Sequence, residues 1–237
     1  MTFLYHELLF RPLFNLLIFL YSNIPGADFG VAIIVLTLIV RIVFFPLSIK
    51  ALVSQRELNK LQPKIKELQE KHKGDKQALG QATMQLYKEH KINPLSGCLP
   101  ILIQLPVLIA LYSALNSGLK LESLVGLYSF VDHPEKINQI ALGFINLAEK
   151  SYLIAILAGV LQWFQMKLAT LSQVSNLKNN TNSQMPDMSK QMLYFFPVMV
   201  IIIAWNLPTG LTLYWVAATV FSIFEQLYIN RKYKTVS

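Results

Sequence analysis

The stretch LTLIVRIVFFPLS, residues 36 to 48, places Arg41 inside an otherwise apolar run. A guanidinium group stays charged at neutral pH, so its chemistry here is to bind an anion, to pair with an acid or to hold water in apolar surroundings. Placing an arginine at the centre of a membrane helix costs at least about 2.5 kcal/mol, which makes such a charge a functional hypothesis by default. The question is therefore which other groups interact with the guanidinium group of Arg41.

The other residues offer two answers. One is an ion pair with Glu225, the single acid that we place within the membrane spans. The other is a water-filled groove lined by polar side chains of several spans, namely Thr37, Gln104, Gln162, Gln165, Thr212, Tyr214 and Trp215. Hydroxyl and amide groups also bridge neighbouring helices, so each of these has a structural alternative. Together with an arginine that lacks a convincing partner, they favour the groove.

The elements that must position these residues are membrane helices. The chain is 54% apolar and 14% charged, against about 25% charged in soluble proteins, and its mean hydropathy is +0.44. Residues 29 to 49 hold no ionisable side chain except Arg41. At about 1.5 Å per residue they cover roughly 31 Å, the thickness of the hydrocarbon core of a bilayer. Cys98 is the only cysteine, which excludes an internal disulfide.

The sequence predicts an all-α integral membrane protein. Its five transmembrane helices are expected at about residues 29–49, 94–117, 151–171, 192–205 and 211–229. The last two are short for a bilayer, so we expect local thinning of the membrane around them.

The first 25 residues have a different character. Residues 3 to 21 are apolar but are interrupted by Glu7, Arg11, Pro12 and Asn15. This profile is typical of an amphipathic helix lying in the membrane interface, with a tilted span as the alternative. We therefore divide the chain into an interfacial helix, residues 1–25, and a core, residues 26–237.

Residues 51 to 92 predict a helical hairpin outside the membrane. They hold nine basic residues against five acidic ones. Apolar residues follow a helical spacing, first at Leu58, Leu61, Ile65 and Leu68 and again at Leu79, Ala82 and Leu86. KGDK, residues 73 to 76, separates the two series and is a turn signal.

The charges of the loops set the orientation. The hairpin is positive, residues 118 to 150 are negative by one, residues 172 to 191 are positive by one, and the C-terminal tail is basic. Five spans place every positive segment on one side, so the positive-inside rule makes the hairpin and the C-terminus cytoplasmic. We expect a multi-pass membrane protein with its groove open to the cytoplasm, and the resemblance described below implies that its membrane is the bacterial plasma (inner) membrane. The net charge of +8 needs no nucleic acid as a partner.

Several classes of function lack support. The sequence contains no HExxH, no GxSxG and no paired intramembrane carboxylates, so an enzyme is not expected, and no cofactor is implied. Another reading of the unpaired arginine is a secondary transporter of a small anionic solute, with Arg41 as counter-charge. Against a transporter stand the absence of an intramembrane acid or histidine relay and of a visible repeat.

Four segments, in order, resemble the core of the YidC membrane protein insertases. They are VRIVFFPLS (40–48), LQPKIKELQEKH (61–72), YKEHKINPLSGCLPILIQLPV (87–107) and LPTGLTLYW (207–215). The resemblance covers the chain from about residue 3. It matches the conserved core, without the extra first span or large extracytoplasmic domain of some members.

The resemblance implies a function and a site. The function is that of a membrane protein insertase and chaperone, which accepts hydrophobic segments of nascent proteins in a cytoplasm-open groove and releases them laterally into the bilayer. Arg41 would lie in this groove and contact the incoming chain. By the same matching, Gln165, Tyr214 and Trp215 would line the groove, while Gln104, Leu105 and Pro106 would face the client from the second span.

The expected partners follow from the same resemblance. They are nascent membrane proteins, the lipid bilayer and, in some settings, a Sec translocon. The hairpin at residues 51–92 would receive clients. The short and modestly basic tail implies only weak binding to a ribosome.

Overall fold

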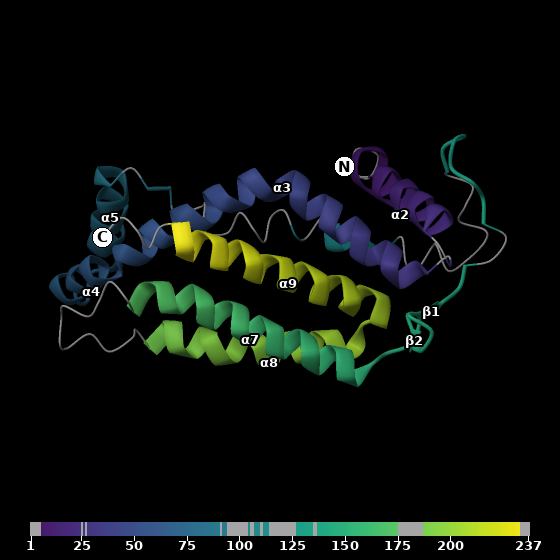
Figure 1. The fold of residues 1–237 in the computed structure, drawn as a ribbon. Coiled ribbons are helices and arrows are strands. Elements are labelled where there is room, and N and C mark those ends of the chain that lie inside the picture. Colours follow the sequence, from purple (N-terminus) through teal and green to yellow (C-terminus); the bar gives the residue numbers. More distant parts are fainter. Residues whose placement is uncertain are drawn as a thin grey trace.

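The computed structural model describes residues 6–24, 26, 28–90, 92–93, 104, 107–109, 111–113, 127–134, 137–174 and 187–232. Its main body consists of four helices, α3 (Phe29–Lys60), α7 (Tyr152–Val174), α8 (Asp187–Asn206) and α9 (Thr209–Lys232). They run side by side along one long axis (Figure 1). Helix α7 packs against α8 and α9, and α9 packs against α3. Most of the predicted span at residues 94–117 lies outside the described residues.

The helices of this body have the length and surface of membrane spans. Within the described residues, α3, Tyr152–Ala169 of α7 and α9 are each long and apolar enough to cross a bilayer, and Leu193–Asn206 of α8 is a shorter apolar helix. Large apolar side chains are exposed on the outside, for example Leu153 at 79% and Phe195 at 65%. The predicted helical membrane protein is thus confirmed, while the count of five spans stays a prediction.

Helix α3 is longer than the span that the sequence predicts. It begins at Phe29, where the side chain of Asp28 accepts hydrogen bonds from the backbone N–H groups of Gly30 (2.8 Å) and Val31 (3.0 Å). It then continues without interruption to Lys60, 11 residues beyond the expected end at residue 49. The change from apolar to charged residues near residue 50 therefore marks a change of surroundings and not the end of a helix.

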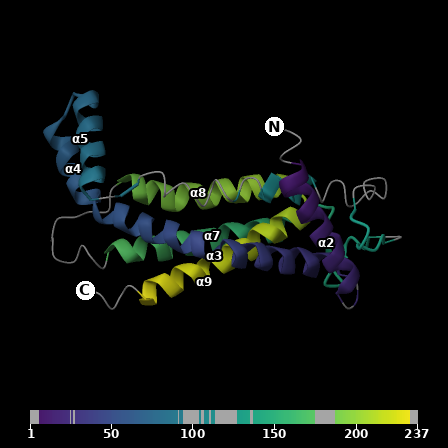
Figure 2. The same ribbon diagram turned by 90° about the horizontal axis from the view of Figure 1, so that it is seen from above.

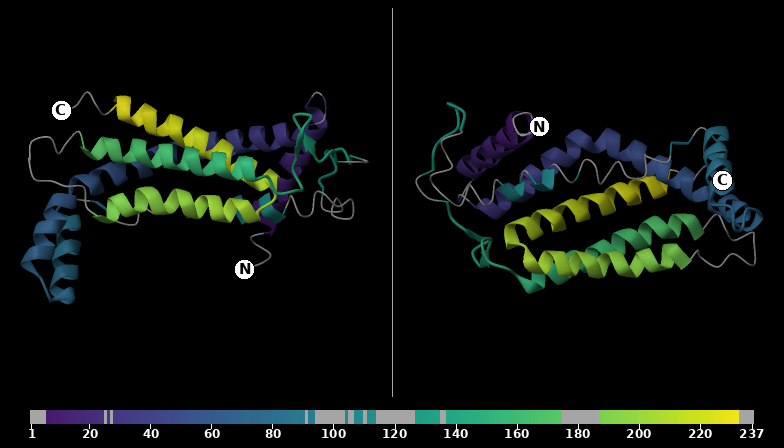
Figure 3. Two further views of the ribbon diagram at one scale, coloured as in Figure 1. Left: turned by 90° about the horizontal axis from the view of Figure 1, so that it is seen from below. Right: turned by 180° about the vertical axis from the view of Figure 1, so that it is seen from behind.

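Two short helices follow at this end of the body. They are α4 (Gln62–Lys71) and α5 (Lys76–Glu89), which contact each other and project to one side of the long axis (Figures 2 and 3). Pro63 lies in the first turn of α4 and lacks the N–H that a continuous helix would need, which explains why the apolar series starting at Leu58 is divided between two helices. Asp75 caps α5 through the N–H groups of Gln77 and Ala78. We call this the hairpin end.

The opposite end carries η1 (His6–Phe10), α2 (Arg11–Asn23) and a ribbon of β1 (Ile140–Ala141) and β2 (Ile145–Asn146), and we call it the ribbon end. The sequence did not predict the strands. Helix α2 packs on α3 through Phe14, Leu17, Ile18 and Tyr21, all buried. Close packing between α3 and β1 requires glycine at position 30, since a Cβ there would lie 2.3 Å from the Cβ of Ala141.

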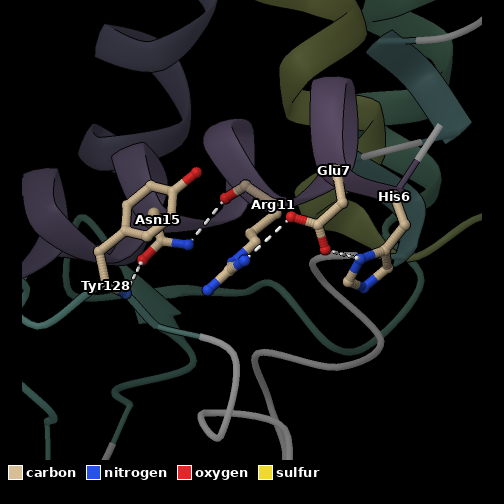
Figure 4. Close-up of polar contacts among 5 residues, drawn as sticks. All are labelled: His6, Glu7, Arg11, Asn15 and Tyr128. Carbon is tan, nitrogen blue, oxygen red and sulfur yellow. Dashed lines mark hydrogen bonds and ion pairs between the residues drawn. The ribbon is translucent and has the colours of Figure 1, made fainter. Parts of the chain in front are cut away.

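A polar cluster attaches η1 and α2 to the segment before the ribbon (Figure 4). The Arg11 Nη1 atom lies 2.9 Å from Glu7 Oε2, and the guanidinium lies 5.0 Å from the centre of the Tyr128 ring. The Asn15 side chain donates to the Arg11 carbonyl (2.8 Å) and accepts from the Tyr128 N–H (2.6 Å). The N-terminal helix is therefore fixed through both its apolar face and this cluster. Whether it lies in the membrane interface stays a prediction.

The cluster predicts a measurable titration. The hydrogen bond from Arg11, followed by that from His6, lowers the pKa of Glu7 below its usual value. A lowered pKa means that the contact stabilises the fold above the ordinary glutamate pKa and is lost as the pH falls through the lowered value. We expect Arg11→Gln to raise the Glu7 pKa in an NMR titration of its carboxyl carbon. Lys60→Gln, which removes the cation paired with Glu57, serves as control, and an unchanged Glu7 pKa in Arg11→Gln would contradict the assignment.

Candidate functional site

Arg41 is held by uncharged side chains from two other parts of the chain. Its Nη2 atom donates a hydrogen bond to Gln104 Oε1 at 2.8 Å. The amide nitrogen of Gln104 donates in turn to the hydroxyl of Tyr214 on α9. This chain of hydrogen bonds joins α3, the segment at residue 104 and α9. It supplies Arg41 with a neutral acceptor in an apolar region, where an unsatisfied guanidinium would be costly.

A cavity lies beside this hydrogen-bonded chain, and we call it the Arg41 cavity. It is lined by residues of α3, of the segment around residue 104 and of α9, namely Thr37, Val40, Arg41, Phe44, Ser48, Ala51, Gln104, Val107 and Tyr214. Its volume of about 40 Å³ has room for about three water molecules. The cavity therefore offers Arg41 a small polar space next to apolar walls.

The ion pair that the sequence left open is not formed. Among the described residues, the ion pairs join Glu7 to His6 and Arg11, and Glu57 to Lys60, and none of them involves Arg41. Glu225 is 2% exposed and lies on α9, but its carboxylate is not within ion-pair distance of Arg41. The structure thus pairs Arg41 with a neutral amide, and the water-filled groove stays a prediction.

The structure brings together four of the predicted site residues. Thr37, Arg41, Gln104 and Tyr214 all line the cavity. Thr37 is buried, and its hydroxyl donates to the carbonyl of Ile33 at 2.6 Å. The hydroxyl hydrogen of Thr37 is therefore already used within α3. The hydrogen-bonded chain thus rests on Arg41, Gln104 and Tyr214.

The other predicted residues lie elsewhere. The side chain of Gln162 donates to Gln165 at 2.8 Å on α7, and neither residue lines the cavity. Trp215 is half-buried on α9 and is also absent from the lining. Leu105 and Pro106 lie outside the described residues. A role in client contact for Gln165, Trp215, Leu105 and Pro106 stays a prediction.

Sequence reasoning missed part of one helical face. Val40, Phe44, Ser48 and Ala51 line the cavity with Arg41. From Arg41 through Phe44 and Ser48 to Ala51 the steps are three or four residues, the spacing of one side of a helix, so the signal was available. Among the residues that were missed, Ser48 matters most, because its hydroxyl adds a polar group to the cavity about two helical turns after Arg41. Within the described parts of the chain, no three His, Cys, Asp or Glu side chains are grouped to hold a metal ion.

Comparison with known proteins identifies the family. A model of the family described as 60Kd inner membrane protein matches residues 19–236. A membrane protein insertase YidC of Fusobacterium nucleatum is 35% identical over 205 residues, which are 86% of this chain and 87% of that protein. The chain belongs to the YidC family of membrane protein insertases.

Other relatives agree and differ mainly in length. The YidC insertase of Geobacter sulfurreducens is 36% identical over 96% of this chain, which spans only 38% of that protein. The YidC 1 insertase of Listeria monocytogenes is 33% identical over 90% of this chain and 68% of that protein. A crystal structure of an active YidC insertase matches the fold with a TM-score of 0.64 over 94% of this chain and 46% of that one, at 24% identity.

Membership of this family decides between the functions that the sequence left open. YidC proteins are insertases and not enzymes, and the family takes its description from the inner membrane. A role in membrane protein insertion therefore replaces the transporter alternative.

The hydrogen-bonded chain predicts a stability effect. Tyr214→Phe removes the oxygen that accepts from the amide of Gln104, so we expect the free energy of unfolding to fall by about 1 kcal/mol. Thermal unfolding in detergent micelles measures this change. Tyr194→Phe is the matched control, because Tyr194 is 63% exposed on α8. Equal stability of the two variants would show that the Gln104–Tyr214 contact contributes nothing.

Proposed function

We propose that the Arg41 cavity is the innermost part of a hydrophilic groove that receives hydrophobic segments of nascent membrane proteins and releases them laterally into the bilayer. The observation that supports this most strongly is an arginine within the apolar stretch of α3 that is held by a glutamine and not by an acid. A cation committed to an acidic partner inside the protein would be unavailable to a client. Arg41 keeps its charge available.

The physical task of an insertase explains why such a charge is useful. A client segment carries polar and charged flanks, and moving one of these groups through hydrocarbon without a partner costs several kcal/mol. A groove that reaches half-way into the membrane shortens the dry path. At its inner end Arg41 forms charge-assisted hydrogen bonds with an acidic group of the client. The apolar part of the client then leaves sideways, because burial in lipid is favourable for it.

The charge pattern supports an orientation for this groove. The hairpin end carries the basic residues of α4 and α5, and the C-terminus of α9 ends in Arg231 and Lys232 at the same end. By the positive-inside rule this end faces the cytoplasm. Clients would then approach from the cytoplasm, where nascent chains are made, with α4 and α5 as the first surface that they meet.

A short helix supports local thinning of the bilayer beside the groove. The apolar part of α8 runs from Leu193 to Asn206, and its 14 residues cover roughly 21 Å, less than the thickness of about 30 Å of a typical hydrocarbon core. A thinner bilayer shortens the path of the client further. Helix α9 is longer than the sequence predicted, so the thinning would be confined to the side of α8.

The proposed partners are those of the sequence analysis. They are nascent membrane proteins, which the groove receives, and the surrounding lipid. A Sec translocon acts with the protein for clients that need one, and a ribosome binds weakly through the basic tail. None of these contacts requires a cofactor.

Two substitutions of Arg41 test the role of its charge. We expect Arg41→Ala to reduce insertion of clients with acidic translocated regions by at least several-fold and to affect clients with neutral regions much less. Arg41→Lys should retain substantial activity, because the proposed contact needs charge more than a bidentate fork. Insertion into proteoliposomes, scored by protease protection of the translocated region, measures both effects.

The matched control is Lys50→Ala, which removes an exposed cation from the same helix outside the cavity. It should insert both client classes as the wild type does. An equal loss for both client classes in Arg41→Ala would rule out charge pairing with the client. Complete loss in Arg41→Lys would point instead to a structural contact specific to the guanidinium group.

A further inference from the structure

Glu225 is a buried carboxyl group that the proposed mechanism does not yet use. It lies on α9, is 2% exposed, and its Oε1 atom has no hydrogen-bond partner within the described part of the chain. Almost all buried polar atoms in proteins have such a partner, because leaving one without a partner costs free energy. A carboxyl oxygen kept in this state calls for an explanation.

Polar and aromatic residues of α3 lie near the part of α9 that carries Glu225. Ser48 and Arg41 on α3 are polar residues close enough to Glu225 to act on its charge. Also between α3 and α9, the ring of Phe45 lies 6.4 Å from that of Phe221 and 6.2 Å from that of Tyr228. Phe221 and Tyr228 precede and follow Glu225 by one helical turn on α9. Aromatic contacts between α3 and α9 therefore lie one helical turn before and one turn after Glu225.

Ser48 connects this carboxyl group to the Arg41 cavity. It lines the cavity as Arg41 does, and it follows Arg41 by seven residues, or about 10 Å, along α3. The direction is toward the hairpin end. The site thus contains a positive group and, toward the hairpin end, a carboxyl group whose Oε1 atom lacks a partner.

We propose that Glu225 is a second recognition residue of the groove, which binds the ammonium or guanidinium group of a lysine or arginine next to the client's hydrophobic segment. This inference rests on the proposed function. The client cation supplies the partner that Oε1 lacks, and displacement of the Phe45 ring from Phe221 and Tyr228 admits it. Arg41 then binds the acidic side of the client and Glu225 its basic side.

Charge complementarity favours this occupant. Membrane segments carry lysine and arginine at their cytoplasmic ends, and Glu225 lies toward the end of the bundle proposed to be cytoplasmic. The two groups therefore favour clients in which an acidic residue precedes a basic one in the direction of the cytoplasm.

The test compares two clients that differ in one residue. One carries lysine at the cytoplasmic end of its hydrophobic segment, and the other carries glutamine at the same position. We expect Glu225→Gln to lower insertion of the lysine client into proteoliposomes at least threefold and to leave the glutamine client unchanged. Glu225→Asp should restore most of the activity with the lysine client. Ser222→Ala, a buried polar position one turn earlier on α9, is the matched control and should affect neither client.

A purely structural role for Glu225 predicts a different result. Glu225→Gln would then lower insertion of both clients by the same factor, and this outcome would overturn the inference while leaving the proposed function intact. Failure of the wild-type protein to insert either client would count against the proposed function itself. The four combinations of protein and client form a double-mutant cycle, in which the inference predicts non-additive effects.

A second measurement does not depend on the folding of a Glu225 variant. A photoreactive phenylalanine analogue replaces Phe45, and the client is stalled during insertion. Adducts are expected at client residues next to the lysine, and loss of these adducts is expected when the lysine is changed to glutamine. Adducts confined to the acidic end of the client, or adducts that do not depend on the lysine, would contradict the inference.

Discussion

The site depends on one constraint, which is that the charge of Arg41 must be stabilised inside an apolar helix without being neutralised. A carboxylate partner would stabilise the charge of Arg41, but it would also take the place of any other anion that the guanidinium group could bind. The structure instead gives the guanidinium a glutamine oxygen at 2.8 Å, fixes that glutamine through the Tyr214 hydroxyl, and leaves a small cavity alongside. The packing of α3 against α9 and the position of residue 104 are what make this arrangement geometrically available.

Other parts of the fold hold the helices that carry this arrangement. At the ribbon end, the buried face of α2 and the contact of Gly30 with Ala141 fix the start of α3. The start of α9 is fixed there too, because the Thr209 N–H donates to the Glu149 carbonyl at 2.8 Å. At the hairpin end, Arg56 donates to the carbonyl of Ile229 at 3.0 Å, which joins α3 and α9 beyond the cavity. The two helices are thus connected on both sides of Arg41.

Much of this fold could be predicted from the sequence, and the exceptions have physical reasons. Long apolar runs identify membrane helices, and Pro208 marks the break between α8 and α9. The end of α3 was placed too early because the change from apolar to charged residues shows only where the helix leaves the lipid. Residues 47 to 60 contain no proline or glycine that would end the helix there. The ribbon at residues 140–146 was missed because strands of two residues have no periodicity to detect. At the site, the spacing of residues along α3 was enough to predict which of them line the cavity. Tyr214 and Trp215 are adjacent in the sequence, and only the packing between helices decides which of the two lies on the side of Arg41.

The central claim, that the Arg41 cavity belongs to the surface that receives a client, is tested most directly by photo-crosslinking. A photoreactive phenylalanine analogue is placed at Phe44, which lines the cavity, and separately at Phe195, which is 65% exposed on the outside of α8. Both changes are conservative, and both proteins are challenged with a stalled nascent membrane protein. We predict adducts with the nascent chain from position 44 and few or none from position 195. Adducts of equal yield from both positions, or from position 195 alone, would contradict the account.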